Sequence, residues 1–189
     1  MPYLTAAVVL VGVVAIVALL LVIVLARRIR DLGAPAGGLE HGPLPAAYDL
    51  AAGSRPSDFR VDTLSGGTVS LDDLSGDWAL VGFFLAGCTP CNRQLPAFVE
   101  LAKAMPGGPG QVVAVLSGRP DKTAEYAARL DGVASVVLES PRADDGTVSH
   151  SFAVSGWPSF YLLDPAGTVE SGAPSLSMLA VPALAGRPR

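Results

Sequence analysis

The feature that most constrains this chain is a pair of cysteines placed between two segments of different periodicity. A continuous apolar run ends in Gly87, and Cys88 and Cys91, the only two cysteines of the sequence, follow it. From Thr89 to Met105 the apolar residues recur with a period near four, which is typical of an amphipathic helix. The sequence therefore predicts a buried strand, a turn, and a helix that begins beside a dithiol.

The spacing of these cysteines predicts thiol–disulfide chemistry. Two cysteines separated by two residues can close a small disulfide, and the unpaired amides and the dipole at a helix N-terminus stabilise a thiolate. The intervening Thr89 and Pro90 fit the first helical turn, where proline is tolerated. Cys88 is the candidate nucleophile and Cys91 the candidate resolving thiol. The only redox group expected is the disulfide that they form, with no cofactor.

Other uses of the pair are a structural zinc site or a purely structural disulfide. A zinc site needs four ligands, and the chain adds only His41 and His150, which we expect to be solvated. We therefore expect no metal. The net charge is −4 and no long basic run is present, so we expect no nucleic-acid partner.

The N-terminal part of the chain predicts a membrane anchor. No charged residue occurs from Leu4 to Ala26, and a helix of this length rises about 35 Å, enough to cross a hydrocarbon core of roughly 30 Å. No Lys or Arg precedes the apolar run and no small-x-small cleavage site follows it, which argues against a removed signal peptide. We assign residues 1–30 to the anchor with its basic flank, and residues 31–56 to a tether rich in Gly, Pro and Ala.

The rest of the chain, residues 57–185, alternates strand-like and helix-like patterns. Helices are predicted over 89–105 and 122–130, the second capped by Asp121, with a helical turn over 147–153 and a weakly helical tail over 175–184. This order gives a three-layer α/β domain of about 120 residues that ends in an antiparallel hairpin. Strands are predicted at 59–64, 68–71, 78–86, 112–116, 134–138, 159–163 and 168–170.

A Gly-Trp-Pro-Ser stretch, with Trp157 and Pro158 directly before a buried strand, is the second notable motif. Together with the Phe-Phe-Leu-Ala-Gly-Cys-x-x-Cys run and the later Leu-Asp-Pro-Ala-Gly turn, it resembles the membrane-anchored thioredoxin-like proteins of the TlpA/ResA type. The anchor and tether also resemble MauD-type members. The resemblance implies a thioredoxin-like α/β/α fold with a mixed central sheet. It also implies that Pro158 is the cis-proline facing the cysteines, that Trp157 contacts the substrate, and that Pro96 kinks the helix.

Two positions depart from this family pattern. Gly87 stands where a tryptophan usually precedes the first cysteine. Gly82 stands where cytosolic thioredoxins carry a buried acid. Without that acid we expect proton transfer to rely on water or on the substrate.

The predicted function is a membrane-tethered thiol–disulfide oxidoreductase that acts on protein thiols or disulfides and exchanges electrons with a redox partner, with Trp157, Thr89 and Pro90 lining the substrate groove. The resemblance places the domain outside the cytoplasm, whereas Arg27, Arg28 and Arg30 after the apolar run favour the cytoplasm by the positive-inside rule. One alternative is a peroxiredoxin-like enzyme, although the residues before Cys88 lack its Pro-x-x-x-Thr-x-x-Cys loop. Another is a non-catalytic assembly factor. Neither the substrate nor the direction of electron flow is encoded in these motifs.

Overall fold

The computed structural model describes residues 50–140 and 147–182. The predicted anchor and most of the predicted tether lie outside these ranges. No helix within them is both long enough and apolar enough to cross a membrane. The elements are β1 (Arg60–Asp62), β2 (Thr68–Ser70), the 3₁₀ helix η1 (Asp72–Leu74), β3 (Ala79–Leu85), α2 (Thr89–Lys103), the 3₁₀ helix η2 (Gly108–Gln111), β4 (Val112–Ser117), α3 (Pro120–Leu130), β5 (Ser135–Glu139), α4 (Val148–Ser151), β6 (Ser159–Leu163) and β7 (Val169–Ala173).

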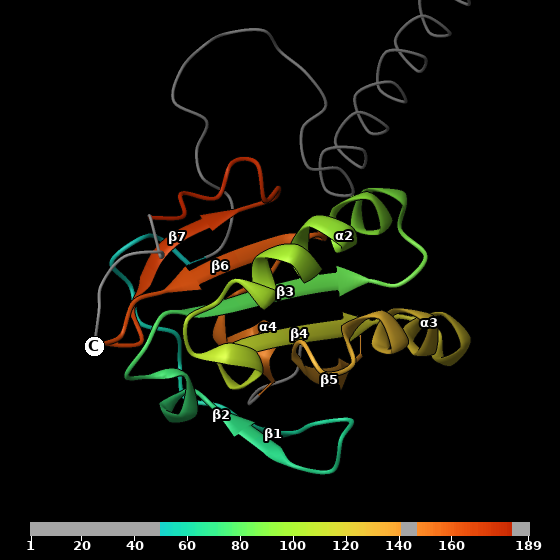
Figure 1. The fold of residues 1–189 in the computed structure, drawn as a ribbon, viewed down its shortest axis with the longest axis horizontal. Helices are drawn as coiled ribbons and strands as arrows, with labels where there is room; N and C mark the ends of the chain where they lie inside the picture. Colours follow the sequence, from blue (N-terminus) through green and yellow to red (C-terminus); the bar gives the residue numbers. More distant parts are fainter. Residues whose placement is uncertain (1–49, 141–146, 183–189) are drawn as a thin grey trace, which may run out of the picture. The chain divides into compact units, whose positions relative to one another are not determined.

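A five-stranded sheet in the order β5-β4-β3-β6-β7 forms the centre of the domain (Figure 1). β3, β4 and β5 run parallel, while β6 and β7 are antiparallel to their neighbours. This confirms the mixed central sheet. The almost continuous apolar run of β3 is explained by its place in the middle, since both faces of a central strand are covered.

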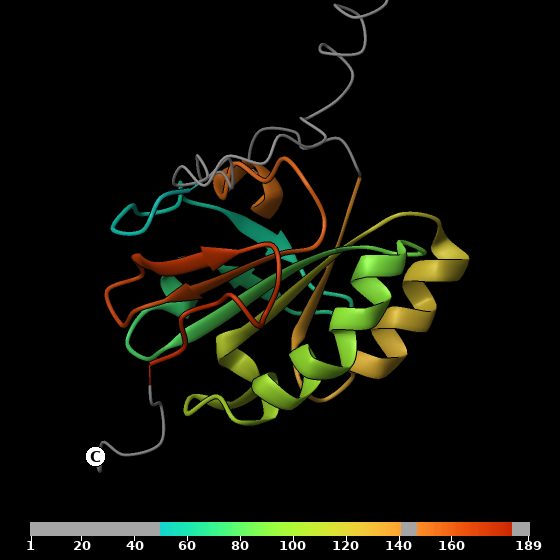
Figure 2. The same ribbon diagram turned by 90° about the horizontal axis from the view of Figure 1, so that it is seen from above.

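Helices α2 and α3 cover one face of the sheet, and α4 with the β1–β2 hairpin covers the other (Figure 2). Because successive side chains of a strand point to opposite faces, β3 contributes to two separate cores. Leu80 and Phe84 pack with α2 and α3, whereas Val81 and Phe83 pack on the opposite face. The helical face is the one that carries the cysteines.

Helix α3 begins differently from the prediction. Its N-cap is Arg119 and its first residue is Pro120, so Asp121 lies inside the first turn and does not cap the helix. The Asp121 carboxylate accepts a hydrogen bond from Arg119 Nε at 3.1 Å instead. The physical reason is that proline is preorganised for the first helical position and moves the start of the helix upstream.

The predicted helical tail is wrong for the part that the structure describes. Residues 174–182 contain turns and irregular backbone but no helix. The Gln94 side chain of α2 donates to Ser175 Oγ at 2.9 Å and accepts from the Leu176 N–H at 3.3 Å. Leu179 is buried in the core under α2. Contacts with α2 thus stabilise a non-helical path that local propensity does not reveal.

Residues directly before the predicted domain start also contact the sheet. The Gly53 N–H donates to the Val169 carbonyl at 2.8 Å, and the Val169 N–H donates to the Ser54 carbonyl at 2.9 Å. The Arg55 guanidinium donates to the Ala166 carbonyl at 2.6 Å. The end of the segment assigned to the tether is therefore bound to the β6–β7 hairpin.

Candidate active site

A tight turn between β3 and α2 positions Cys88. The Ala86 N–H donates to the Ser117 carbonyl of β4 at 2.8 Å, and the Cys88 N–H donates to the Leu85 carbonyl at 3.1 Å. Between them Gly87 has a φ of +93°, which L-residues with a side chain rarely adopt. This backbone conformation favours a glycine at the position before the first cysteine.

Cys88 is the N-cap residue of α2 and is half-buried. Thr89 and Pro90 are the first two helical residues, both exposed, and the first turn holds no acidic side chain. The unpaired amides and the dipole at a helix N-terminus favour a negative charge at this position. Cys88 therefore combines access to solvent with a place at the N-terminus of a helix.

Cys91 lies one turn further into α2 and is fully buried, with 0% exposure. The Leu85 N–H donates to its Sγ at 3.4 Å. Burial raises the pKa of the Cys91 thiol to about 12, and its hydrogen bond to Cys88 and the charge of that thiol act in the same direction. Cys91 is thus held protonated at neutral pH, and both thiols are free in this structure.

The loop before β6 lies beside the same turn. The peptide bond between Trp157 and Pro158 is cis, as the family resemblance implies. The antiparallel register pairs Phe83 of β3 with Ser159 of β6, so the two residues before Ser159 lie along the end of β3 that leads to Cys88. Trp157 is half-buried and packs against both cores. The structure therefore brings the cis-proline loop and the cysteine pair to one end of the sheet.

Position 82, where cytosolic thioredoxins carry a buried acid, is closed by packing. A Cβ atom added to Gly82 would lie 2.5 Å from Cε2 of Phe98, an aromatic residue on the buried face of α2. No side chain fits there unless the Phe98 ring moves. Aromatic side chains of the core therefore fill the space that an acid at position 82 would occupy.

One residue near the cysteines was missed at the level of sequence. Tyr126 of α3 is 2% exposed, and its phenol responds to the charges of Cys91 and Cys88. Its helical spacing marks it only as a core position. No local motif links it to the cysteine pair, because the link runs between two helices.

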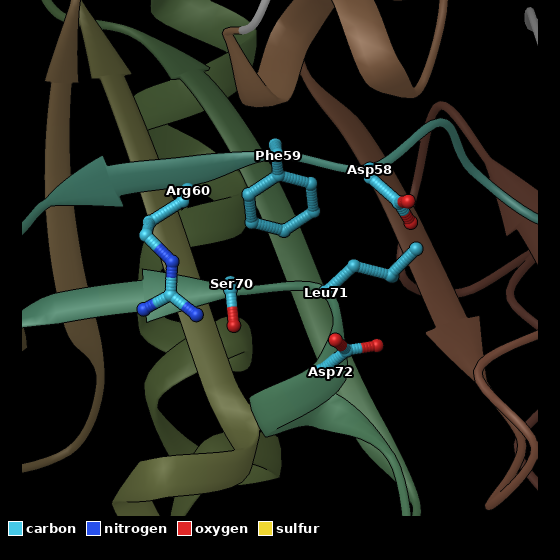
Figure 3. Close-up of a pocket in the computed structure, with 6 residues that line it drawn as sticks. All are labelled: Asp58, Phe59, Arg60, Ser70, Leu71 and Asp72. Carbon is cyan, nitrogen blue, oxygen red and sulfur yellow. The ribbon is translucent and has the colours of Figure 1, made fainter.

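A metal site or a pocket with reactive side chains would be another possible centre of chemistry among the described residues, and Figure 3 shows one surface hollow. Among the described residues, no three His, Cys, Asp or Glu side chains gather as metal ligands, and His150 is exposed on α4. The hollow, of about 400 Å³, belongs to the β1–β2 side of the domain and contains neither a thiol nor an imidazole. Its lining consists of Asp58, Phe59, Arg60, Ser70, Leu71 and Asp72.

Comparison with known proteins agrees with this geometry. Over 125 residues the chain is 28% identical to the thioredoxin-like protein YneN of Bacillus subtilis, covering 64% of this chain and 70% of that protein. Over 122 residues it is 29% identical to the thiol-disulfide oxidoreductase ResA of Geobacillus thermodenitrificans, covering 64% and 68%.

A solved structure gives the same picture. The thioredoxin domain of a thiol-disulfide oxidoreductase from Bacteroides vulgatus superposes with a TM-score of 0.52 at 25% identity, covering 65% of this chain and 88% of that one. Fold and relatives define the class as thioredoxin-like thiol–disulfide oxidoreductases. The AhpC/TSA family model matches residues 52–171, and the chain belongs to that family.

Proposed function

We propose that this protein is a membrane-tethered oxidoreductase that exchanges electrons with the thiols and disulfides of other proteins through Cys88 and Cys91. The observation that carries the proposal is the unequal exposure of the two thiols on one helical turn. Cys88 is accessible at the helix N-terminus, and Cys91 is fully buried behind it. Such a pair separates the encounter with a substrate from the closing of the disulfide.

In the reducing direction the reaction has two steps. The Cys88 thiolate attacks one sulfur of a substrate disulfide, forming a mixed disulfide, and the other substrate sulfur leaves as a thiolate that takes a proton from water. Cys91 then loses its proton to water and attacks Cys88 Sγ. The Cys88–Cys91 disulfide forms and the second substrate sulfur leaves. The substrate gains two electrons, which the dithiol loses, and a redox partner restores the dithiol. The same steps in reverse oxidise a substrate dithiol.

The loop beside the dithiol supplies the substrate contact in this proposal. The backbone of Trp157 pairs with an extended substrate segment next to Cys88, as an added strand pairs with an open edge. The Trp157 indole, together with the exposed Thr89 and Pro90, offers apolar surface around the attacking sulfur. These groups bind the segment around a substrate cysteine and leave the remainder of the substrate free to vary.

Loss of the nucleophile tests the catalytic part of the proposal. The full chain in detergent is assayed for reduction of insulin disulfides with a thiol reductant in excess. We expect Cys88→Ser to reduce turnover to the uncatalysed background. The exposed neighbour variant Asn92→Ser keeps both thiols and should match the wild type. Turnover of Cys88→Ser at the wild-type rate would refute the proposal.

We further propose that residues 4–26 anchor the protein and that the domain lies outside the cytoplasm, as in the family that the sequence resembles. Intact cells expressing the full chain are treated with a membrane-impermeant maleimide, with Cys88→Ser as the control. Labelling of the wild type before lysis is the expected result. Protection until lysis would place the domain in the cytoplasm, as the three arginines after the apolar run favour.

A further inference from the structure

Tyr126 of α3 is a buried phenol that interacts electrostatically with both cysteines and with the backbone of Gly87. It is on the buried face of α3 and belongs to the same apolar core as Cys91. Its ring contacts Phe84 of β3 edge to face, with the centroids 6.2 Å apart. Helix α3 thus brings a phenol from a distant part of the chain into the core that contains Cys91.

The phenolic oxygen of Tyr126 is an exception among buried polar atoms. It is shielded from solvent, and no group in the described ranges makes a well-formed hydrogen bond with it. The Gly87 N–H is close enough to act on the phenolic oxygen as a weak donor, but the hydroxyl proton itself has no acceptor among the described residues. The polar groups that act on it are the backbone of Gly87, the thiols of Cys91 and Cys88 from α2, and the Arg129 guanidinium from its own helix. An unpaired buried hydroxyl destabilises a fold, so its presence calls for an explanation.

The chemistry of Tyr126 suits a hydrogen-bond donor and not a base. Burial, followed by the charges of Cys91 and Cys88, raises the pKa of the Tyr126 phenol, so the hydroxyl keeps its proton at neutral pH. A protonated phenol can donate to a thiolate, and a hydrogen bond to a charged acceptor is stronger than one to a neutral acceptor. Cys91 becomes such an acceptor in the second step of exchange.

A hydrogen-bond donor near Cys91 would stabilise its thiolate, which is otherwise buried in an apolar core. The thiol of Cys91 is fully buried, and Phe98 fills the space in which an acid at position 82 would act. A buried thiolate is unfavourable unless fixed dipoles or donors stabilise it. The Leu85 N–H supplies one donor to Cys91 Sγ.

We propose that Tyr126 is a positioning residue for Cys91, and that its hydroxyl donates a hydrogen bond to the Cys91 sulfur when this sulfur becomes a thiolate and attacks the mixed disulfide. The inference rests on the proposed dithiol function. No proton leaves Tyr126: the proton of Cys91 goes to water, and the new sulfur–sulfur bond forms between Cys91 and Cys88. In the dithiol form the hydroxyl proton has no acceptor among the described residues, which destabilises the fold, and in the thiolate form the Cys91 sulfur becomes that acceptor.

Stopped-flow reaction with Ellman's reagent separates the two steps. The first thionitrobenzoate is released when Cys88 forms its mixed disulfide, and the second when Cys91 attacks that disulfide. We expect Tyr126→Phe to leave the first phase unchanged. The second phase should slow by about tenfold at pH 7, with its pH profile displaced by about one unit to higher pH.

Tyr161→Phe is the matched control. It also removes one hydroxyl from a fully buried tyrosine, but Tyr161 lies in the core on the opposite face of the sheet, and its hydroxyl donates to the Phe152 carbonyl at 3.5 Å. Both phases of this control should match the wild type. Equal second-phase rates for Tyr126→Phe and the wild type would overturn the inference and leave the proposed function standing. A wild type without any second phase would refute the dithiol function and the inference together.

Two further measurements exclude a merely structural effect. Because Tyr126→Phe removes an unpaired hydroxyl, its melting temperature should equal or exceed that of the wild type, so slower chemistry would not come from a weakened fold. In a Cys88→Ser background, alkylation of Cys91 by iodoacetamide should also slow by about tenfold when Tyr126 is replaced by Phe. Unchanged alkylation would count against the proposed hydrogen bond, independently of any redox step.

Discussion

Cys88 and Cys91 are identical groups one helical turn apart, yet their surroundings differ in nearly every respect. Cys88 is the N-cap residue of α2, is half-buried, and follows Gly87, where an added Cβ atom would have no neighbour within 4 Å. Cys91 is fully buried, accepts from the Leu85 N–H, and has its pKa raised by burial to about 12. In the proposed mechanism this difference in burial assigns two roles: encounter with the substrate for the accessible, half-buried thiol, and resolution of the mixed disulfide for the fully buried one.

Removal of the buried partner is the strongest test of this division. Cys91→Ser keeps the attacking thiol but lacks the group that releases the substrate, so we expect multiple turnover to fall by about a thousandfold, or ~4 kcal/mol. Mixed disulfides through Cys88 should accumulate and be visible on non-reducing gels. Cys88→Ser/Cys91→Ser is the control and should trap nothing. Absence of adducts with Cys91→Ser would favour a non-catalytic binding module.

The difference in reactivity can also be measured without a substrate. At neutral pH a thiol with a pKa near 12 holds only about a thousandth of the thiolate of an ordinary cysteine. We expect iodoacetamide to alkylate Cys91 in Cys88→Ser about a hundredfold more slowly than Cys88 in Cys91→Ser. The Cys91 rate should rise about tenfold per pH unit. In concentrated urea the two rates should converge, and equal rates in the folded state would contradict the assigned roles.

The packing between Gly82 and Phe98, in the core that also contains Cys91, is the next place to test the comparison. An alanine at Gly82 would place its Cβ 2.5 Å from the Phe98 ring, and such overpacking costs about 1–3 kcal/mol. Gly110→Ala, where no atom lies within 4 Å of the added Cβ, should change the free energy of unfolding by less than about 0.5 kcal/mol. Urea unfolding under reducing conditions measures both. If Gly82→Ala changed the free energy of unfolding as little as Gly110→Ala, the Phe98 ring would be able to move aside more easily than the short distance indicates.

The order of strands and helices along the chain and the start of α2 directly after Cys88 were predictable because they depend on local patterns. The unbroken apolar run of β3, the period near four after Thr89, and the Thr-Pro pair each act within a few residues. The strand 159–163 was predicted with the bounds that the structure shows. Among the site residues, Cys88 and Cys91 could be chosen from spacing, while Pro158 required a resemblance to a family.

What the sequence could not reveal depends on contacts between elements. The non-helical tail follows from hydrogen bonds of Gln94, which no property of residues 174–182 announces. The place of Tyr126 in the same core as Cys91 arises from the packing of α3 and α2 on one face of the sheet, and the closure of position 82 arises from the Phe98 ring. Each of these features is tertiary, so no local pattern in the sequence indicates it.

The last and smallest prediction uses the pH dependence of stability. The pKa of the Cys91 thiol is about 12 in the folded protein against an ordinary value of 9.0, so above pH 9 the unfolded chain loses a proton that the folded chain keeps. Stability from this group is complete below pH 9 and is lost as the pH rises towards 12, by about 1.4 kcal/mol for each pH unit.

Comparison of variants isolates this contribution. Urea unfolding under reducing conditions at pH 8.5 and 10 should show a loss for the wild type that exceeds the loss for Cys91→Ala by about 1 kcal/mol. The Tyr126 phenol, whose pKa is also raised by burial and then by Cys91 and Cys88, adds a loss of the same sign at still higher pH. Tyr126→Phe removes only that second part. Identical losses for the wild type and Cys91→Ala would mean that the Cys91 thiol titrates normally, and that its burial does not keep it protonated.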